Sequence, residues 1–543
     1  MLLRIAHFNG ISPRTSPRLL ADTFATVSRN TKLWNGSVRP WRETQAVASL
    51  ARIGAKRTIY RFGQDHADDS NYWLHWLTDV DVVRSPVAGN ERTFFTGDGA
   101  PKVTDSVLAL TGGEAYPNAA YDLGVPSPTQ QPVANVTGTA GASETPVLRF
   151  YVYTFVNAWG EEGAPSPVSA SVSATVSQTI SITNMEVPSG AQSYASKRIY
   201  ETNGVGEAAD FYMKAEVPAG QTAVSFPAAT TAAPNVAGTM TIGSLLVTAG
   251  WTPPPANLHS LTMMAGQILC GISGQAVRMA EPGYPYAWPA RYEFTFEYDP
   301  VAIASYGNTL VVATKGVPYF IQGFEPATMQ QTKIEREYAC VSRRSMVAIG
   351  GGVAYASPDG MIVVDQGGAT NVTEAFFDRD QWQALKPSSM HAYWWDNRIV
   401  VFYDTGSVQG GLIFSPGSEP SELGFYTEGA YVDPLRDALY VIVGNEVHRF
   451  DAAAQMQTFV WRSKVFQSGR PCNFGAAQIH LADSITFRLY GDDVLRHEQT
   501  VIDNTPFRLP SGYLAEEWQF EIEGTSEVFS LAVAETMREL RQV

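Results

Sequence analysis

Cysteine and charge are both scarce in this chain. Its 543 residues include three cysteines, Cys270, Cys340 and Cys472, which lie far apart and form no Cys-x-x-Cys pair. That spacing excludes a cysteine-rich zinc site and argues against a disulfide scaffold. Charged residues make up 17% of the chain, below the ~25% that is usual. The 53 acidic residues outnumber the 38 basic ones, which leaves a formal net charge of −15.

Runs of basic residues and long apolar runs are also absent from the sequence. Tight phosphate binding needs clustered cations, so the sequence predicts no high-affinity nucleic-acid surface. An acidic wall past which DNA slides fits the charge, and so does ordinary solubility. No window of about 18 apolar residues predicts a membrane-spanning helix. Arg4 and His7 interrupt the apolar N-terminal patch, which predicts no secretion signal and a reducing cytoplasm as the place of folding.

Aromatic residues, glycine and proline are plentiful. Aromatics make up 11% of the chain, with 46 glycines and 33 prolines. Short apolar runs separated by Gly, Pro, Asn and Asp predict a mostly β protein, and the length predicts about three to five domains. Helical spacing is clearest over 16–34, where Ser16 is a candidate N-cap before Pro17. We therefore expect a short N-terminal helix.

Similar units recur after residue 258. Each has an apolar strand, a turn and a second strand, and the turns centre near Gly266, Asn308, Gly351, Asn397 and Arg436. Steps of roughly 39–46 residues are typical of four-stranded propeller blades, although a long meander or sandwich remains the alternative. The segment 80–106 has the same order of strands and turns, and residues 35–75 are a candidate for a further blade.

The repeats are interrupted by a segment of different composition. Only 12 of the 122 residues from 129 to 250 are charged. The run Phe150–Val156 has apolar residues on both faces, which favours a central strand of a fibronectin type III-like sandwich. We predict five regions: 1–34, an N-terminal arm and helix; 35–128, the first blades; 129–250, the inserted sandwich; 251–455, the remaining blades; and 456–543, a C-terminal β domain.

Two groups of side chains are candidates for chemistry. Glu161 and Glu162 follow the strand in a Gly-Glu-Glu-Gly turn. Adjacent residues of an extended segment point to opposite faces, which favours a solvated turn over an acid/base pair. His66, Asp68, Asp69 and His75 have the composition of a metal site, but their spacing matches no known ligand pattern, which favours a polar loop. Neither group predicts an enzyme, a cofactor or a metal.

An ordered set of segments resembles the tail nozzle, or tail tubular protein B-like, family of short-tailed bacteriophages. The segments are "FNGISPRTSPRLLADTFATVSRNTKLWNGSVRP", "RTFFTGDGAPKVTD", "YDLGVPSPTQQP", "YVYTFVNAWGEEGAPSP", "PFRLPSGYLAEEWQFEIEG" and "LAVAETMREL". Together they cover most of the chain in the expected order. Some family members carry much larger nozzle insertions than this chain.

The resemblance implies a structural virion protein. Its subunits would form a ring, most often a homohexamer, below the portal-adaptor ring, and would extend and close the DNA ejection channel. Genomic DNA would pass without sequence-specific binding, and both chain ends would contribute to the platform that meets the adaptor and the tail fibres or spikes. Assembly would occur in the host bacterial cytoplasm, and the final location would be the virion tail.

The predicted N-terminal arm and helix supply the candidate docking residues. They are Arg14, Arg18, Leu19, Leu20 and Phe24. The helix either docks a partner or simply caps the propeller. Two other functions stay open: a propeller adhesin or glycan-processing enzyme, and a receptor-binding tail-tip protein whose sandwich holds a host glycan.

Overall fold

The computed structural model describes residues 1–63, 68–86, 91–202, 210–228 and 243–540. The protein is mostly β, with many four-stranded antiparallel sheets, as the spacing of turns predicts. Helices are short, and none in the described ranges is long and apolar enough to span a membrane. They are α1 (Ser106–Leu110), α2 (Arg379–Ala384), α3 (Met537–Leu540) and the 3-10 helices η2 (Arg343–Ser345) and η3 (Pro387–Ser389).

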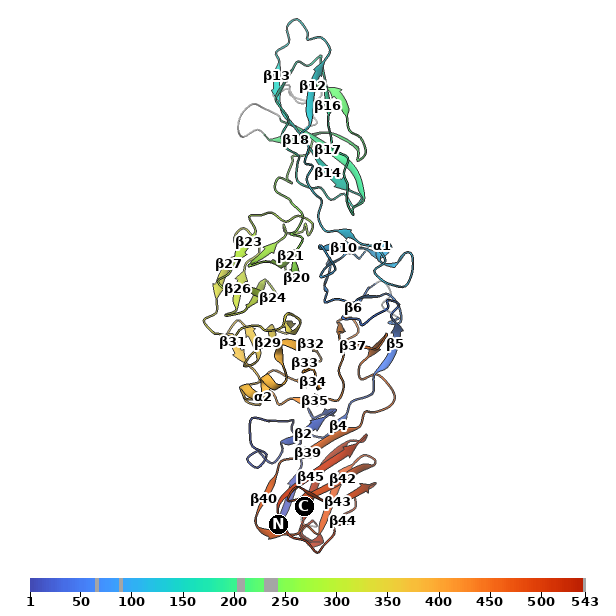
Figure 1. Cartoon of the computed structure of the whole chain (residues 1–543), viewed down its shortest axis with the longest axis vertical. Coiled ribbons are helices and arrows are strands. Elements are labelled where there is room, and N and C mark those ends of the chain that lie inside the picture. The colour runs from blue at the N-terminus through green and yellow to red at the C-terminus, as the bar shows by residue number, and fades with distance from the viewer. Residues whose placement is uncertain (64–67, 87–90, 203–209, 229–242, 541–543) are drawn as a thin grey trace.

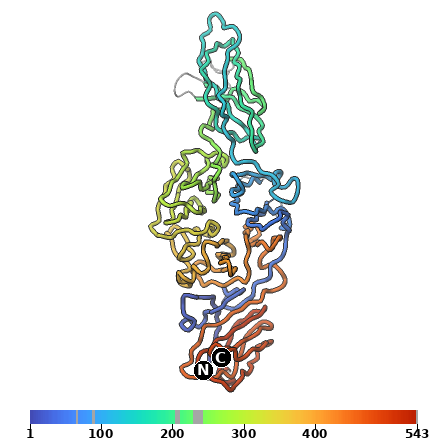
Figure 2. Tube along the Cα trace, viewed as in Figure 1, coloured from blue at the N-terminus to red at the C-terminus, as the bar shows by residue number. Residues whose placement is uncertain are grey.

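The molecule is elongated and has three parts along its long axis (Figure 1). Both chain ends lie in a terminal platform at one end, a ring of sheets lies in the middle, and a sandwich lies at the far end. The Cα trace runs from the platform through the ring to the sandwich and then returns to the platform (Figure 2). The sandwich is therefore an insertion within the ring.

The ring of sheets is built from short antiparallel strands. Its strands are β5 (Gln45–Ser49), β6 (Thr58–Arg61), β7 (Trp73–Trp76), β8 (Asp81–Arg84), β9 (Thr93–Thr96), β10 (Lys102–Thr104), β11 (Tyr121–Asp122), β20 (His259–Met264), β21 (Ile268–Ser273), β22 (Ala276–Met279), β23 (Glu293–Thr295), β24 (Pro300–Tyr306), β25 (Thr309–Thr314), β26 (Tyr319–Gln322), β27 (Gln330–Lys333), β28 (Val347–Ile349), β29 (Gly352–Ser357), β30 (Gly360–Asp365), β31 (Gly368–Asn371), β32 (His391–Trp395), β33 (Arg398–Asp404), β34 (Gln409–Phe414), β35 (Ser421–Leu423), β36 (Ala430–Asp433), β37 (Ala438–Val443) and β38 (Glu446–Arg449).

The first strands of successive sheets contact one another around the ring. β8 lies beside β20, followed by β24, β28, β32, β36 and β6 in that order. The Thr58 hydroxyl on β6 accepts from the Val80 amide just before β8, at 3.0 Å, which closes the circle. This arrangement is propeller-like, and each predicted turn lies in the hairpin between the first two strands of a sheet.

The N-terminal part of the chain completes the last sheet of the ring. β5 pairs antiparallel with β38 and becomes the outer strand of the sheet β36–β37–β38–β5. Residues separated by about 400 positions thus share one sheet, as in the pairing of Ser49 with Glu446. The segment 35–75, a candidate for a further blade, contributes to three sheets, through β4 (Arg39–Pro40), β5 and the β6–β7 pair.

The terminal platform contains both ends of the chain. Its strands are β1 (Leu2–Ile5), β2 (Ala25–Arg29), β3 (Thr31–Lys32), β4 (Arg39–Pro40), β39 (Phe459–Ser463), β40 (Phe466–Cys472), β41 (Ala476–Leu481), β42 (Ile485–Gly491), β43 (Val494–Val501), β44 (Phe507–Arg508), β45 (Ala515–Gly524) and β46 (Val528–Ala534). β1 pairs with β46, and β2 joins β35 of the ring to β39 of the platform. One continuous sheet therefore links ring and platform.

The prediction of a helix over 16–34 is wrong. Residues 25–29 form β2, which pairs with β39, and only short turns precede it, such as the bond from the Leu19 amide to the Ser16 carbonyl at 2.8 Å. The β-branched Thr26 and Val27 suit a strand, and the sheet supplies backbone partners on both sides of β2. Long-range pairing therefore outweighs a weak helical pattern.

The sandwich has a core of aromatic and β-branched residues. Its strands are β12 (Val133–Thr137), β13 (Val147–Arg149), β14 (Tyr151–Asn157), β15 (Val172–Ala174), β16 (Thr179–Thr183), β17 (Tyr194–Thr202), β18 (Phe211–Pro218) and β19 (Val224–Pro227). Every residue of β14 is buried, as predicted for a strand with both faces covered, but β14 is an edge strand of the sheet β14–β17–β18 and not the predicted central strand. Tyr151, Tyr153 and Phe155 pack into the core with Ile180 and Ile182.

Candidate functional site

The adjacent glutamates are buried and ion-paired, so the interpretation of a solvated turn is wrong. Glu161 Oε1 lies 2.5 Å from Arg92 Nη1, and its Oε2 accepts from the side-chain Nδ2 of Asn157 at 2.7 Å. Burial raises the pKa of Glu161, and the Arg92 guanidinium opposes that shift. Gly160 and Gly163 mark a turn in the sequence, but both side chains between them are buried, and Glu161 is covered because two parts of the protein meet at this turn.

Glu162 points the other way, into the sandwich. Its carboxylate accepts from Thr154 at 2.6 Å and Tyr200 at 2.6 Å, and it pairs with Arg198 at 2.7 Å. The expectation that the two glutamates face opposite directions is therefore confirmed. Glu161 serves the contact between sandwich and ring, whereas Glu162 serves the sandwich alone.

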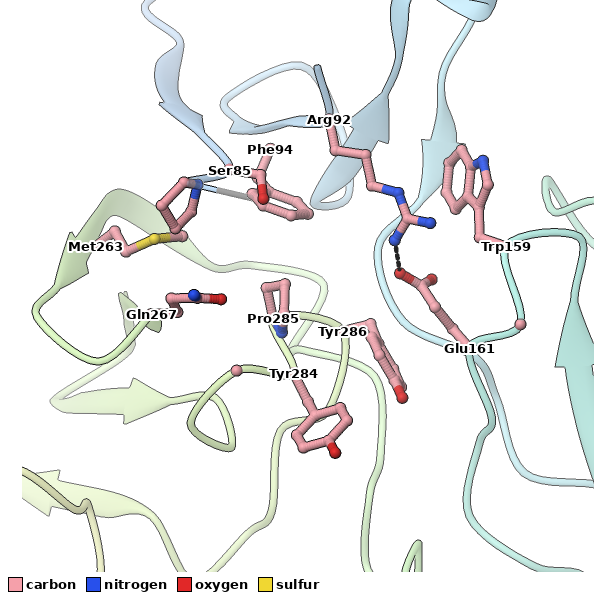
Figure 3. A pocket seen from close by; sticks show the side chains of 13 residues that line it. Ser85, Arg92, Phe94, Trp159, Glu161, Met263, Gln267, Tyr284, Pro285 and Tyr286 are labelled. Carbon is pink, nitrogen blue, oxygen red and sulfur yellow. Dashed lines mark hydrogen bonds and ion pairs between the residues drawn. The ribbon is translucent and has the colours of Figure 1, made fainter. Parts of the chain in front are cut away.

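Arg92 and Glu161 hold the sandwich on the ring (Figure 3). The Arg92 guanidinium also lies 4.5 Å from the centre of the Trp159 ring, and the indole nitrogen of Trp159 donates to Asp105 at 3.2 Å. Backbone bonds add to the contact, from the Asp122 amide to the Ala191 carbonyl at 2.9 Å and from the Ala164 amide to the Trp251 carbonyl at 3.1 Å. The junction is a built interface of charge, aromatic stacking and backbone pairing.

Asp68, Asp69 and His75, the described members of the candidate metal group, have separate partners. His66 lies outside the described residues. Asp68 caps its own loop by accepting from Ser70, Asp69 accepts from the Tyr440 hydroxyl at 2.7 Å, and His75 is buried with both ring nitrogens near backbone groups of Trp73 and Arg52. Within the described ranges, no group of three or more His, Cys, Asp or Glu side chains is placed to hold a metal ion. All three cysteines are free and buried.

The predicted docking residues separate into different environments. Leu20 is buried and Phe24 packs against the platform core, whereas Leu19 is 79% exposed. Arg18 makes a two-point contact with Glu517 on β45, at 2.7 and 3.0 Å. Arg14 donates from its side chain to the Glu374 carbonyl. The two arginines tie the N-terminal arm to the chain itself, and Leu19 is the exposed apolar residue of the set.

A charged cluster inside the ring was not predicted. Arg343 of η2 pairs with Asp81 of β8 at 2.9 Å, and Arg344 pairs with Asp79 at 3.4 Å. Arg344 also donates to the Glu428 carbonyl at 2.6 Å, so one short segment contacts several sheets. The adjacent arginines and the Asp-x-Asp spacing are visible in the sequence, but nothing local links segments more than 260 positions apart.

Comparisons with known proteins return only distant structural likeness. No protein-family model and no curated protein sequence matches the chain. The solved structures that it resembles include an exo-beta-1,3-galactanase from Phanerochaete chrysosporium, with 9% identity over 74% of this chain and 99% of that chain and a TM-score of 0.23.

Two further likenesses are equally weak. PorZ of Porphyromonas gingivalis shows 11% identity over 88% of this chain and 79% of its own, with a TM-score of 0.23. The β-propeller domain of Cps50 (Swd1) from Myceliophteria thermophila shows 11% identity over 59% of this chain and 100% of its own, with a TM-score of 0.21. Scores this low carry no inference about what this chain does.

Proposed function

We propose that this chain is a structural, non-enzymatic subunit of a bacteriophage tail, a nozzle protein whose copies form a ring, most often a hexamer. The ring would extend the DNA ejection channel below the portal-adaptor complex and close it until infection. On this proposal the ring of sheets is a β-propeller interrupted by a fibronectin type III-like sandwich. The segments that resemble the tail nozzle family supply the starting point for this proposal.

The observation that carries the proposal is the placement of both chain ends in one platform, opposite the sandwich (Figure 1). β1 pairs with β46, and the N-terminal amine lies 3.0 Å from Glu535 and 3.3 Å from Glu539. A subunit of a tail needs one end for its neighbours toward the capsid and another end that faces outward. An elongated chain with a closed terminal platform supplies two separated faces of this kind.

The sheet and the core that platform and ring share support a role in a rigid assembly. The sheet that runs from β32 to β43 crosses from the ring to the platform without a break in strand pairing. One hydrophobic core contains both Trp382 and Ile399 of the ring and Trp461 and Trp518 of the platform. Close-packed cores resist deformation, so platform and ring are expected to move as one body.

The charge distribution suits a wall along which DNA moves without adhering. The net charge is −15, and prominent arginines already have acidic partners, as Arg488 does in Glu498, Glu521 and Glu523. Paired cations attract phosphate weakly, since binding depends on cations that are free to replace counterions. Passage without sequence-specific binding is the expected behaviour.

Electron microscopy of the source particle, with gold-labelled antibody against this chain, tests the proposal. Label at the end of a short tail, together with symmetric averaged density of the subunit's shape, is the expected result. The purified chain should also form rings whose mass is an integral multiple of the subunit mass. Intact particles without label would overturn the assignment to the virion and leave an adhesin or glycan-processing protein as the next hypothesis.

A further inference from the structure

A cavity of about 410 Å³ lies at the junction of sandwich and ring. We call it the junction cleft. Three parts of the chain line it: Arg92 and Phe94 from the sheet β8–β11, Trp159 and Glu161 from the sandwich, and Gln267 and Tyr286 from the next sheet and the loop that follows it (Figure 3). Its volume falls within the ~300–1,000 Å³ range of small-molecule sites.

The walls of the junction cleft combine flat apolar surfaces with planar polar groups. Figure 3 shows Pro285 and Tyr286 on one side, with Phe94 and Arg92 on the other. The Arg92 guanidinium and the Glu161 carboxylate lie side by side at 2.5 Å. A guanidinium has five N–H donors and a carboxylate accepts at both oxygens, so this pair keeps donors and acceptors beyond the bond that joins them.

Gln267 is held in a backbone conformation that its residue type seldom adopts. It lies in the turn between β20 and β21 with φ of 61°. Asn, Asp and Gly occupy this left-handed region readily, whereas other residues enter it at a cost of about 1 kcal/mol or more. Its amide side chain points toward Pro285 (Figure 3). A planar amide thus lines the cleft on the side of the ring.

We propose that the junction cleft binds a neutral saccharide. A sugar ring presents an apolar face of C–H groups and a rim of hydroxyls, each of which both donates and accepts. The apolar face suits Pro285 and Tyr286, and neighbouring hydroxyls suit the adjacent donors and acceptors of Arg92 and Glu161. Gln267 supplies both a donor and an acceptor to a further hydroxyl.

Charge favours a neutral ligand over an anionic one. Arg92 and Glu161 cancel each other, and Glu161 is buried beside its partner. A phosphate or carboxylate would have to compete with Glu161 for Arg92 and would leave that buried carboxylate without its cation, which is costly. Hydroxyl groups bridge the pair without breaking it.

The site exists only where ring and sandwich meet. The sandwich contributes Trp159 and Glu161, while Arg92, Gln267 and Tyr286 come from the ring. A sandwich isolated as residues 129–250 would therefore lack more than half of the cleft. The proposal stands apart from the tail function proposed above, since a saccharide site suits a virion protein and a free adhesin equally.

Saturation-transfer NMR on the full chain tests binding directly. The probes are maltose, cellobiose, lactose and N,N′-diacetylchitobiose, each titrated with tryptophan fluorescence as a second readout. We expect saturation transfer from the protein to the sugar protons of at least one of the four disaccharides. Its dissociation constant should lie below about 10 mM, the range of weak binding. Absence of transfer from all four at about 10 mM would overturn the proposal.

Two variants locate the binding to the cleft. Gln267→Gly removes the amide and relieves the unfavourable φ, so the fold should persist while affinity falls about tenfold, as expected for the loss of one well-placed polar contact. Met263→Trp places an indole at the cleft wall and should abolish transfer. Asp493→Gly is the matched control for Gln267→Gly, since Asp493 also has a positive φ, 60°, but lies in the platform. This variant should leave saccharide affinity unchanged. Unchanged affinity in both folded cleft variants would contradict the assignment.

Discussion

Arg343 Nη1 lies 2.9 Å from Asp81 Oδ2, and this ion pair joins two sheets of the ring that are not neighbours. Asp81 belongs to β8, and Arg343 belongs to η2, which precedes β28; the sheets that begin with β20 and β24 lie between them. Asp81 also accepts from the Ser260 amide at 2.8 Å. Partial burial raises the pKa of Asp81, and Arg343 opposes that shift. The pair therefore ties the ring across its inner side.

Replacing Arg343 should loosen the inner side of the ring. In Arg343→Met, Asp81 keeps only uncharged donors, and the local opening free energy of β8 and β20 should fall by about 1–3 kcal/mol. The expected loss of opening free energy is modest because both side chains are about a quarter exposed. Hydrogen-exchange mass spectrometry measures it region by region, which suits a chain of several parts.

An exposed ion pair supplies the control for that experiment. Arg379 pairs with Asp359 at 2.9 Å, with the arginine side chain 68% exposed. Arg379→Met should change local opening by less than about 1 kcal/mol. Equal effects of the two substitutions would mean that the inner pair contributes no more than a surface contact.

Acid should weaken the ring through His391. This buried side chain at the start of β32 packs against Phe402, with ring centroids 5.5 Å apart, and burial lowers its pKa to about 3. The ordinary histidine value is 6.5. At a pH between these two pKa values, His391 binds a proton in the unfolded chain but not in the folded chain. Stability is therefore complete above pH 6.5 and falls with decreasing pH, by at most about 1.4 kcal/mol for each pH unit.

The His391→Phe variant isolates this contribution. Thermal midpoints recorded from pH 7.5 to pH 4.5 should decline less steeply in the variant than in the native chain. His480 is exposed, so His480→Phe should leave the slope of the native chain unchanged. Parallel slopes in all three proteins would assign the acid sensitivity to other groups.

The local pattern of the sequence predicts hairpins well but not the long-range pairings of strands. The turns near Asn308 and Asn397 lie where glycine and asparagine spacing puts them, because a hairpin depends on neighbouring residues. The pairing of β2 with β39 and of β5 with β38 joins segments about 400 positions apart. No local pattern encodes such contacts, and they explain why 16–34 is not a helix.

In the candidate site, too, the sequence predicts what depends on neighbouring residues and misses what depends on distant ones. The opposite directions of Glu161 and Glu162 follow from strand geometry, and the structure confirms them. Their burial does not follow from local pattern, because it depends on Arg92, which lies 69 positions earlier. Turn composition indicates solvent exposure only when nothing packs on the turn. The ion pair of Arg343 with Asp81 was missed for the same reason.

Glu161 and Glu162 should have separable roles although they are adjacent. Glu161→Gln removes the charge that pairs with Arg92, so the contact between sandwich and ring should open more often. The Asp122 amide, which bonds to the Ala191 carbonyl across the junction, should exchange about tenfold faster, the loss expected for one charged hydrogen bond.

Glu162→Gln is the matched control for that substitution. Its partners, Arg198, Thr154 and Tyr200, all belong to the sandwich. Exchange should accelerate in β14 and β17 and stay unchanged at Asp122. If both variants accelerate Asp122 equally, the division of roles between the two glutamates is wrong.

Leu19 and Leu20 separate docking from stability in the N-terminal arm. Leu20 is 5% exposed, so Leu20→Ala should destabilise the platform by about 2–4 kcal/mol through loss of buried surface and an unfilled cavity. Leu19 is 79% exposed, and Leu19→Ala should change stability by less than about 0.5 kcal/mol. Hydrogen exchange in β2 and β39 measures the change in stability that each substitution causes.

The same pair tests the docking role predicted for the arm. If Leu19 contacts a partner in the tail, Leu19→Asp should leave the isolated chain folded, with unchanged exchange in β2. The substitution should nevertheless lower the incorporation of the chain into particles, measured by the ratio of this chain to the capsid protein in purified virions. A folded Leu19→Asp chain that incorporates normally would exclude Leu19 from docking, and the arm would then be a structural brace held by Arg14 and Arg18.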